Sequence, residues 1–208
     1  MKPIARNELL DLGAYEQIRE RFRARIIAEK KQRRFSPAPE LSVVFENRDT
    51  ALFQIQEMLR TERITKESGI AHELETYNEL VPGEGELSAT MFVEIAERDP
   101  RERRLVELAG LEHRLALEID GTRIAARNET HGILEDRTTA VHYLKFPLGT
   151  GSRAAAALLE IAAAAAAGAT TGAEGRAFFL VDHLHLSARA PLPATLLSAL
   201  AEDLRAPA

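Results

Sequence analysis

The chain has 208 residues, of which 45% are apolar, 28% charged and 5% aromatic. This composition is ordinary for a folded globular protein, and at this length folding buries about 70% of the surface of the unfolded chain. The sequence contains no cysteine. The absence of cysteine excludes a structural disulfide, a thiolate zinc site and an iron–sulfur cluster held by thiolates of this chain.

Charge is distributed unevenly along the chain. The net charge of −5 argues against general nucleic-acid binding, which needs a clustered positive surface. Residues 1–34 contain 10 Lys or Arg and 5 Asp or Glu, a net charge of +5, so the remaining residues carry −10. A basic N-terminal helix of this kind either docks an acidic partner or is a solvated helix face.

Neither a secretory signal nor a membrane span is expected. Residues 1–12 lack the apolar segment and the cleavage site of a secretory signal. The alanine-rich stretch 154–167 is interrupted by Glu160 and is shorter than the roughly 20 strongly apolar residues that span a bilayer. We therefore expect a cytoplasmic protein that has no membrane partner.

The first 82 residues are predicted to be mainly helical. Tyr15, Ile18, Phe22 and Ile26 recur at three- and four-residue spacing and form one apolar stripe of the first helix. Prolines directly after this helix end it. Asn47 or Asp49 caps the second helix. The predicted elements are helices over 14–34, 50–64 and 67–80 and a short strand over 41–45 that pairs with the main sheet.

The second part of the chain has the alternation that is typical of strands. Asp120 and Gly121 form a two-residue hairpin turn, which sets Leu117 opposite Ile124 and Glu118 opposite Arg123 as an attractive pair. The predicted strands are 87–95, 113–119, 122–128, 141–146 and 177–187. The predicted helices are 99–108, 152–167 and 193–204.

These elements predict an α+β fold, with N-terminal helices followed by a mostly antiparallel β-sheet on which helices are packed. Residues 1–208 are expected to form a single domain. Within it, residues 1–82 make the mainly helical region, and residues 83–208 make the sheet region with two further helices on the sheet.

Three histidines are the best candidates for a metal site. His183 and His185 are two residues apart on a predicted strand, so both side chains point to one face, and His142 lies on another predicted strand. If the two strands are neighbours, three imidazoles converge and could hold one transition metal such as zinc or iron. Glu94 or Glu46 could add a carboxylate. The alternative is that the histidines are hydrogen-bonded core residues.

A second candidate is a polar cleft around the second helix. Charged residues are dense there, and such density lines a cleft or forms a solvated face with ion pairs between successive turns. The candidate cleft residues are Glu46, Arg48, Asp49, Glu57, Arg60 and Glu94.

Six segments of the chain stand out together: 45–50, 54–60, 77–82, 86–90, 141–146 and 181–183. In this order they resemble a family of uncharacterised bacterial proteins that is catalogued only as a domain of unknown function. The resemblance covers most of the chain, from Ile4 to about Arg205. Leu184 and His185 depart from it, since a proline and an aromatic residue are expected there.

The resemblance implies an accessory role in a bacterial redox or peroxide-stress system. Genes of the family often neighbour those for a rubrerythrin-like protein and for an iron–sulfur oxidoreductase related to heterodisulfide reductase subunits. The first hypothesis is therefore an interaction protein that binds these partners, with a homodimer as the default assembly. The alternatives are a metal-binding protein or metal-dependent enzyme that uses the strand histidines, with Glu94 as general base, and a small-molecule binding module.

Overall fold

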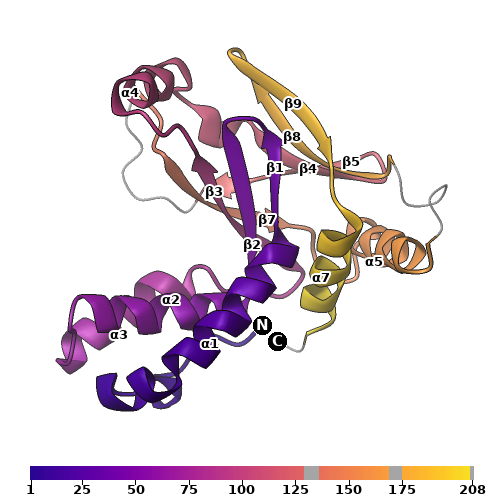
Figure 1. Cartoon of the computed structure of the whole chain (residues 1–208). Coiled ribbons are helices and arrows are strands. Elements are labelled where there is room, and N and C mark those ends of the chain that lie inside the picture. Colours follow the sequence, from indigo (N-terminus) through magenta and orange to yellow (C-terminus); the bar gives the residue numbers. More distant parts are fainter. Residues whose placement is uncertain (129–135, 169–174, 207–208) are drawn as a thin grey trace.

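The computed structural model describes residues 1–128, 136–168 and 175–206, and it places two antiparallel sheets above a layer of helices (Figure 1). Sheet A has the strand order β1 (Arg34–Ala38), β2 (Leu41–Glu46), β3 (Glu86–Val93), β7 (Val141–Pro147) and β6 (Arg127–Asn128). Sheet B has the order β5 (Thr122–Ala125), β4 (Leu115–Ile119), β8 (Ala177–His183) and β9 (Leu186–Pro191). The predicted α+β class is confirmed, although the expected single sheet is two sheets.

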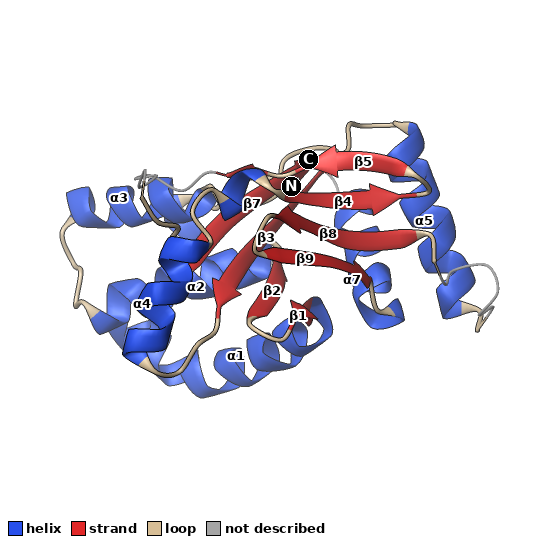
Figure 2. Ribbon diagram, turned by 90° about the horizontal axis from the view of Figure 1, so that it is seen from above, coloured by secondary structure: helices blue, strands red, loops and turns tan. Residues whose placement is uncertain are grey.

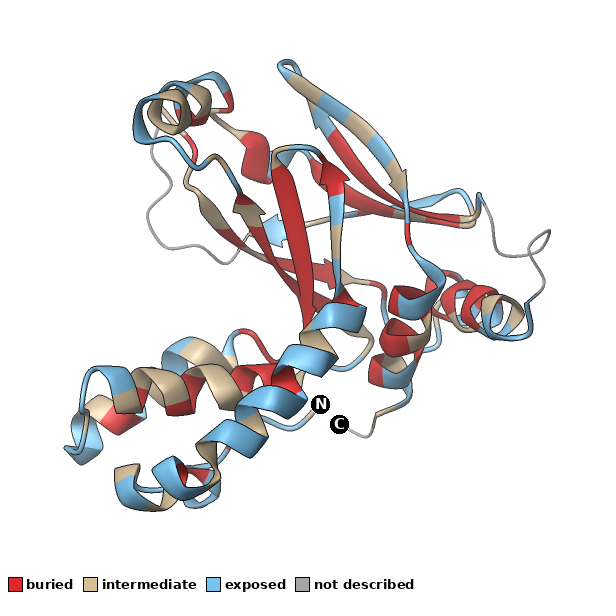
Figure 3. Ribbon diagram, viewed as in Figure 1, coloured by how far each residue is buried: buried red, intermediate tan, exposed pale blue. Residues whose placement is uncertain are grey.

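The main core fills the space between the two sheets. Phe45 and Phe146 of sheet A have ring centroids 6.0 Å apart, and Phe146 lies 6.0 Å from Phe179 of sheet B. These rings are fully buried. The helices α5 (Arg153–Ala166) and α7 (Ala194–Arg205) pack their buried faces against the same core (Figures 2 and 3). Apolar burial of this kind is the dominant stabilising contribution in a globular core.

The predicted hairpin register is confirmed, since Leu117 pairs with Ile124 and Glu118 with Arg123. The predicted strand 122–128, however, is two strands in different sheets. β5 pairs with β4 in sheet B, whereas β6 pairs with β7 in sheet A. This segment therefore connects the two sheets at one corner.

The expected ion pair across this hairpin is replaced by two others. Arg189 of β9 reaches over the ring of Phe178, 3.3 Å from its centroid, and its Nη2 lies 2.7 Å from Glu118. Arg123 instead pairs with Asp182 at 3.3 Å. Each of these pairs joins strands two places apart in sheet B, β4 with β9 and β5 with β8, which a hairpin considered by itself does not reveal.

Two further segments differ from the prediction. Residues 34–38, expected to be a break after the first helix, form the edge strand β1, where a proline is tolerated because no ladder donor is required of it. The predicted strand 177–187 is the hairpin of β8 and β9, in which His183 pairs with Leu186 and residues 184 and 185 form the turn. β8 is central in its sheet, as its apolar sequence predicted.

A smaller apolar cluster holds the helical layer together. The helices are α1 (Leu12–Arg33), α2 (Arg48–Thr61) and α3 (Glu67–Asn78), preceded by the short η1 (Arg6–Glu8). Of the two predicted caps, Asn47 is the one that caps α2, because its side chain accepts a hydrogen bond from the N–H of Thr50. The buried members of this cluster are Ile4, Leu9, Ala51, Ile55, Leu59, Ile70, Leu80 and Val81.

Two short helical elements, α4 (Arg98–Glu107) and η2 (Leu111–His113), lie at the opposite end of the sheets from the helical layer (Figure 1). Within the described ranges, no helix combines the length and the apolar character needed to cross a bilayer.

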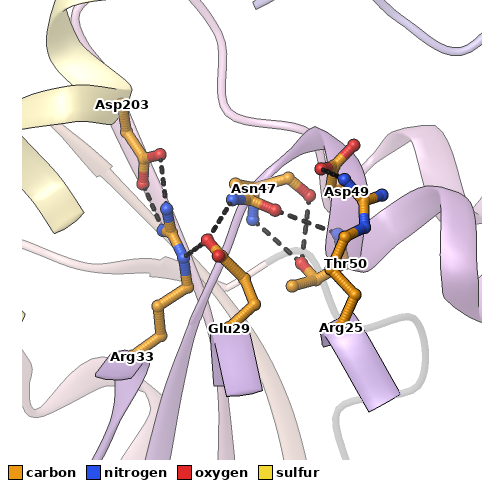
Figure 4. Close-up of polar contacts among 7 residues, drawn as sticks. All are labelled: Arg25, Glu29, Arg33, Asn47, Asp49, Thr50 and Asp203. Carbon is orange, nitrogen blue, oxygen red and sulfur yellow. Dashed lines mark hydrogen bonds and ion pairs between the residues drawn. The ribbon is translucent and has the colours of Figure 1, made fainter. Parts of the chain in front are cut away.

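A buried ionic network joins the helical layer to the rest of the protein (Figure 4). Arg33, at the end of α1, donates two hydrogen bonds to Asp203 of α7, at 2.6 and 2.9 Å. It also donates to Glu29 at 2.6 Å, and Glu29 accepts a hydrogen bond from Asn47 at 2.9 Å. Burial raises the pKa of Asp203 above its usual value, against the opposing effect of Arg33. The network fixes the direction in which α1 leaves the sheet.

Candidate functional site

His142 is a buried residue on the inner face of sheet A. Its Nε2 lies 3.2 Å from the hydroxyl of Thr138, which donates its proton to the buried carboxylate of Glu112 at 2.9 Å. Because that proton is committed to Glu112, the hydroxyl accepts Nε2–H of His142. Burial lowers the pKa of His142, although Glu112 opposes this effect. The structure therefore holds His142 neutral in the core.

His183 and His185 do not share a strand face, so that prediction is wrong. His183 ends β8, and His185 lies in the turn before β9. Nδ1 of His183 accepts the backbone N–H of His185 at 3.2 Å, and Nε2–H therefore donates to the carbonyl of Ala109 at 3.0 Å. Both ring nitrogens of His183 are committed to holding the hairpin turn, which leaves neither for a metal ion.

The premise that the histidine strands are neighbours is also wrong, because β7 belongs to sheet A and β8 to sheet B. Across the described residues, no group of three or more His, Cys, Asp or Glu side chains is placed to hold a metal ion. The rings of His183 and His185 lie close together, with centroids 5.8 Å apart, but His142 is in the other sheet and does not join them.

The six residues of the predicted polar cleft have individual partners. Glu46 is buried on sheet A and accepts a hydrogen bond from Thr90 at 2.8 Å. The other five form ion pairs, which mostly fasten α2 to α1 and to the N-terminal segment instead of facing an open cleft. These pairs are Arg48–Glu8, Asp49–Arg25, Glu57–Arg19, Arg60–Glu16 and Glu94–Arg34.

A pocket of about 470 Å³ lies beside these ion pairs, between the N-terminal segment, α1 and α2. None of the six predicted cleft residues lines it. We call this pocket the α1–α2 groove, and its lining residues are Glu8, Leu10, Tyr15, Ile18, Arg21, Phe22, Arg25, Leu52 and Gln56.

The apolar stripe of α1 is covered only in part. Of its 22 residues, Tyr15, Ile26 and Arg33 alone are buried. Ile18 and Phe22, in the middle of the predicted stripe, are half-buried and line the groove, and Ile27 is 52% exposed. A helix of 22 residues that buries only three side chains leaves part of its apolar stripe uncovered.

Basic side chains form one edge of the groove. Arg21 is exposed and has no ion pair or hydrogen bond with any described residue. Arg25 pairs with Asp49 at 2.9 Å and covers the ring of Phe22 at 5.1 Å from its centroid. Glu8, the acidic lining residue, is already paired with Arg48. The edge of the groove is therefore positive.

A second hollow, of about 630 Å³, lies beside the β8–β9 turn. Leu184 at this turn is 90% exposed. The lining residues are Ala109, Gly110, His113, Arg114, Asp182, His183 and Leu184. It is more polar than the α1–α2 groove, and its histidines do not form a metal cluster with their neighbours.

From the sequence, Ile18 and Phe22 belong to the apolar stripe of the first helix, and Arg21 and Arg25 only add to its positive charge. The helical spacing does contain the relevant pattern, since 18, 21, 22 and 25 share one face of a helix. Nothing in the sequence reveals, however, that this face is left partly uncovered.

The protein belongs to the class of α+β proteins in which two antiparallel sheets enclose the core and a charged helical layer lies at one end. The chain matches the model of a family described as "Protein of unknown function (DUF3501)" over residues 3–204, and it is a member of this family. It is also similar to a crystal structure of a novel protein of unknown function from Burkholderia pseudomallei. That protein is 33% identical, with a TM-score of 0.83, over 98% of this chain and 100% of the other. Among curated proteins, none matches this sequence.

Proposed function

We propose that this protein is an accessory protein that binds another protein through the α1–α2 groove. The observation that supports it most is α1 itself, which exposes most of its surface. It carries half-buried Ile18 and Phe22 beside Arg21, which pairs with none of the described residues. Aromatic residues and arginine are the side chains that contribute most at protein interfaces. The ion pairs between α1 and α2 hold this surface in place before a partner arrives.

The family resemblance supports a bacterial redox or peroxide-stress system as the setting of this interaction. The proposed partners are a rubrerythrin-like protein and an iron–sulfur oxidoreductase. Since this chain has no cysteine, any thiolate-held cluster belongs to the partner. The protein under this proposal positions or stabilises a partner that carries the electrons.

Titration calorimetry with each candidate partner from the same bacterium tests the proposal. We expect micromolar binding at about 50 mM salt that weakens at about 300 mM, because rim charges are screened. Arg21→Glu should abolish binding, whereas Arg103→Glu, on exposed α4 far from the groove, should leave it unchanged. The absence of a complex with either partner, or equal binding by both variants, would overturn the proposal.

Elemental analysis of the isolated protein tests the competing metal hypothesis. A stoichiometric transition metal that is lost in a His183→Ala/His185→Ala variant would replace the proposal by metal binding. A metal-free, folded protein is the expected result, because one nitrogen of His183 bonds within the turn and the other bonds to the carbonyl of Ala109.

A further inference from the structure

We propose that the α1–α2 groove accepts an acidic peptide segment that inserts one large apolar side chain between α1 and α2. This inference rests on the proposed function and specifies the chemistry of the partner. It follows from three properties of the groove: an apolar floor, a positive edge and a frame held by hydrogen bonds.

The floor of the groove suits an apolar side chain. Its side chains are mostly apolar, with Ile18, Phe22 and Leu52 among them, and its volume of about 470 Å³ falls in the range of specific binding pockets. The polar atoms here are engaged, because the Tyr15 hydroxyl donates to Glu57 at 2.8 Å. Gln56 likewise exchanges hydrogen bonds with the backbone of Leu10, at 2.7 and 3.3 Å. An inserted polar group would therefore lose its hydration without adequate replacement.

The edge of the groove suits carboxylates. Arg21 and Arg25 are one turn apart on α1, and both line the pocket. Arg21 has no partner among the residues described, and the Arg25–Asp49 pair is exposed on both sides and therefore worth little. Arginine binds carboxylates with two parallel hydrogen bonds, so a partner carboxylate competes well for both positions. A basic segment would meet repulsion instead.

Hydrogen bonds within the protein hold the frame of the groove. Arg19, which is largely covered, donates two hydrogen bonds to Glu57, both at 2.8 Å. The buried Arg33 network fixes the far end of α1. A partner segment therefore orders mainly itself on binding, which preserves affinity for a short peptide.

Fluorescence anisotropy with synthetic peptides tests the inference. The probe is a labelled peptide of about 12 residues with a central phenylalanine flanked by glutamates, which is the anchor pattern of groove-binding segments. Two comparison peptides replace either all glutamates by glutamine or the phenylalanine by alanine. We expect each replacement to weaken binding at least about tenfold. Arg21→Glu and Phe22→Ala should weaken the parent peptide similarly, and Arg103→Glu should not.

Equal binding of the three peptides, or no binding of any, overturns the inference. If the partner proteins bind and Arg21→Glu abolishes that binding, while no peptide binds, the inference of an acidic segment with an apolar side chain is wrong and the proposed function stands. If instead the acidic peptide binds selectively while neither partner protein binds, the inference stands and the proposed partners are wrong. Light scattering tests whether a second copy of this chain binds in the α1–α2 groove instead. Self-association that Arg21→Glu abolishes would show that it does, and would overturn the inference.

Discussion

The two-sheet core and the helical layer are stabilised in different ways. Between the sheets, fully buried aromatic rings such as Phe146 and Phe179 contact each other. In the helical layer, α1 buries few residues and is fastened to α2 by ion pairs such as Arg19–Glu57. The core should therefore resist salt and moderate acid, whereas the attachment of α1 should respond to both. A surface that binds a partner is expected in the less completely packed of the two regions.

The largest expected effect is in the core. Phe179→Ala removes a fully buried ring that contacts Phe35 and Phe146, at centroid distances of 5.8 and 6.0 Å. We expect the free energy of unfolding to fall by about 3–5 kcal/mol, measured by urea denaturation. Val106→Ala, at a residue that is 54% exposed, should change it by less than about 0.5 kcal/mol. Similar losses in the two variants would mean that the core is not located between the sheets.

The next effect is at the junction of the two regions. Arg33→Met leaves Asp203 buried without its partner, so we expect a loss of about 3 kcal/mol in thermal or urea unfolding. Burial raises the pKa of Asp203, and a carboxyl group with a raised pKa makes stability fall as pH rises, because its charged form is unfavourable in the core. In the Arg33→Met variant this charged form has no partner. The loss of stability should therefore be smaller near pH 4, where Asp203 is closer to its protonated form, than at pH 7. The double variant Arg33→Met/Asp203→Leu should recover most of the stability, and a loss that the second substitution leaves unchanged would exclude the ionic explanation.

A smaller effect is expected from acid on the helical layer. The hydrogen bonds from Arg19 hold the pKa of Glu57 below its ordinary value. A lowered carboxyl pKa gives stability that is present above about pH 4.3 and is lost as pH falls below it. The protection of α1 amides against hydrogen exchange, relative to the intrinsic rate at each pH, should therefore fall in this range before that of β3 amides. Glu57→Gln should reproduce the loss of protection at pH 7, at a cost of about 1 kcal/mol. An equal loss of protection in α1 and β3 would contradict the comparison.

The smallest effect is expected from Leu184, at the tip of the β8–β9 turn. Leu184 is 90% exposed, so Leu184→Ser should change the unfolding free energy by less than about 0.5 kcal/mol. His183→Ala, in contrast, removes both hydrogen bonds that brace the turn and should cost about 1–2 kcal/mol. Equal effects of the two variants in urea denaturation would show that the histidine does not hold the turn.

The sequence by itself determined the local features of this protein. Apolar periodicity located α1 and α2, the alanine-rich stretch located α5, Asn47 was one of two candidate caps of α2, and the Asp120–Gly121 turn set the register of its hairpin. These features depend on residues that are close in the chain, where propensity and side-chain spacing act directly.

Only the tertiary structure decided which distant residues meet. It divided the strands between two sheets, separated His142 from His183, and committed the charges of α2 to partners on α1. It also left Ile18 and Phe22 half-covered beside Arg21. Spacing along a helix shows which side chains share a face. Whether that face is covered depends on the packing of elements far apart in sequence, since burial is a property of the assembled fold.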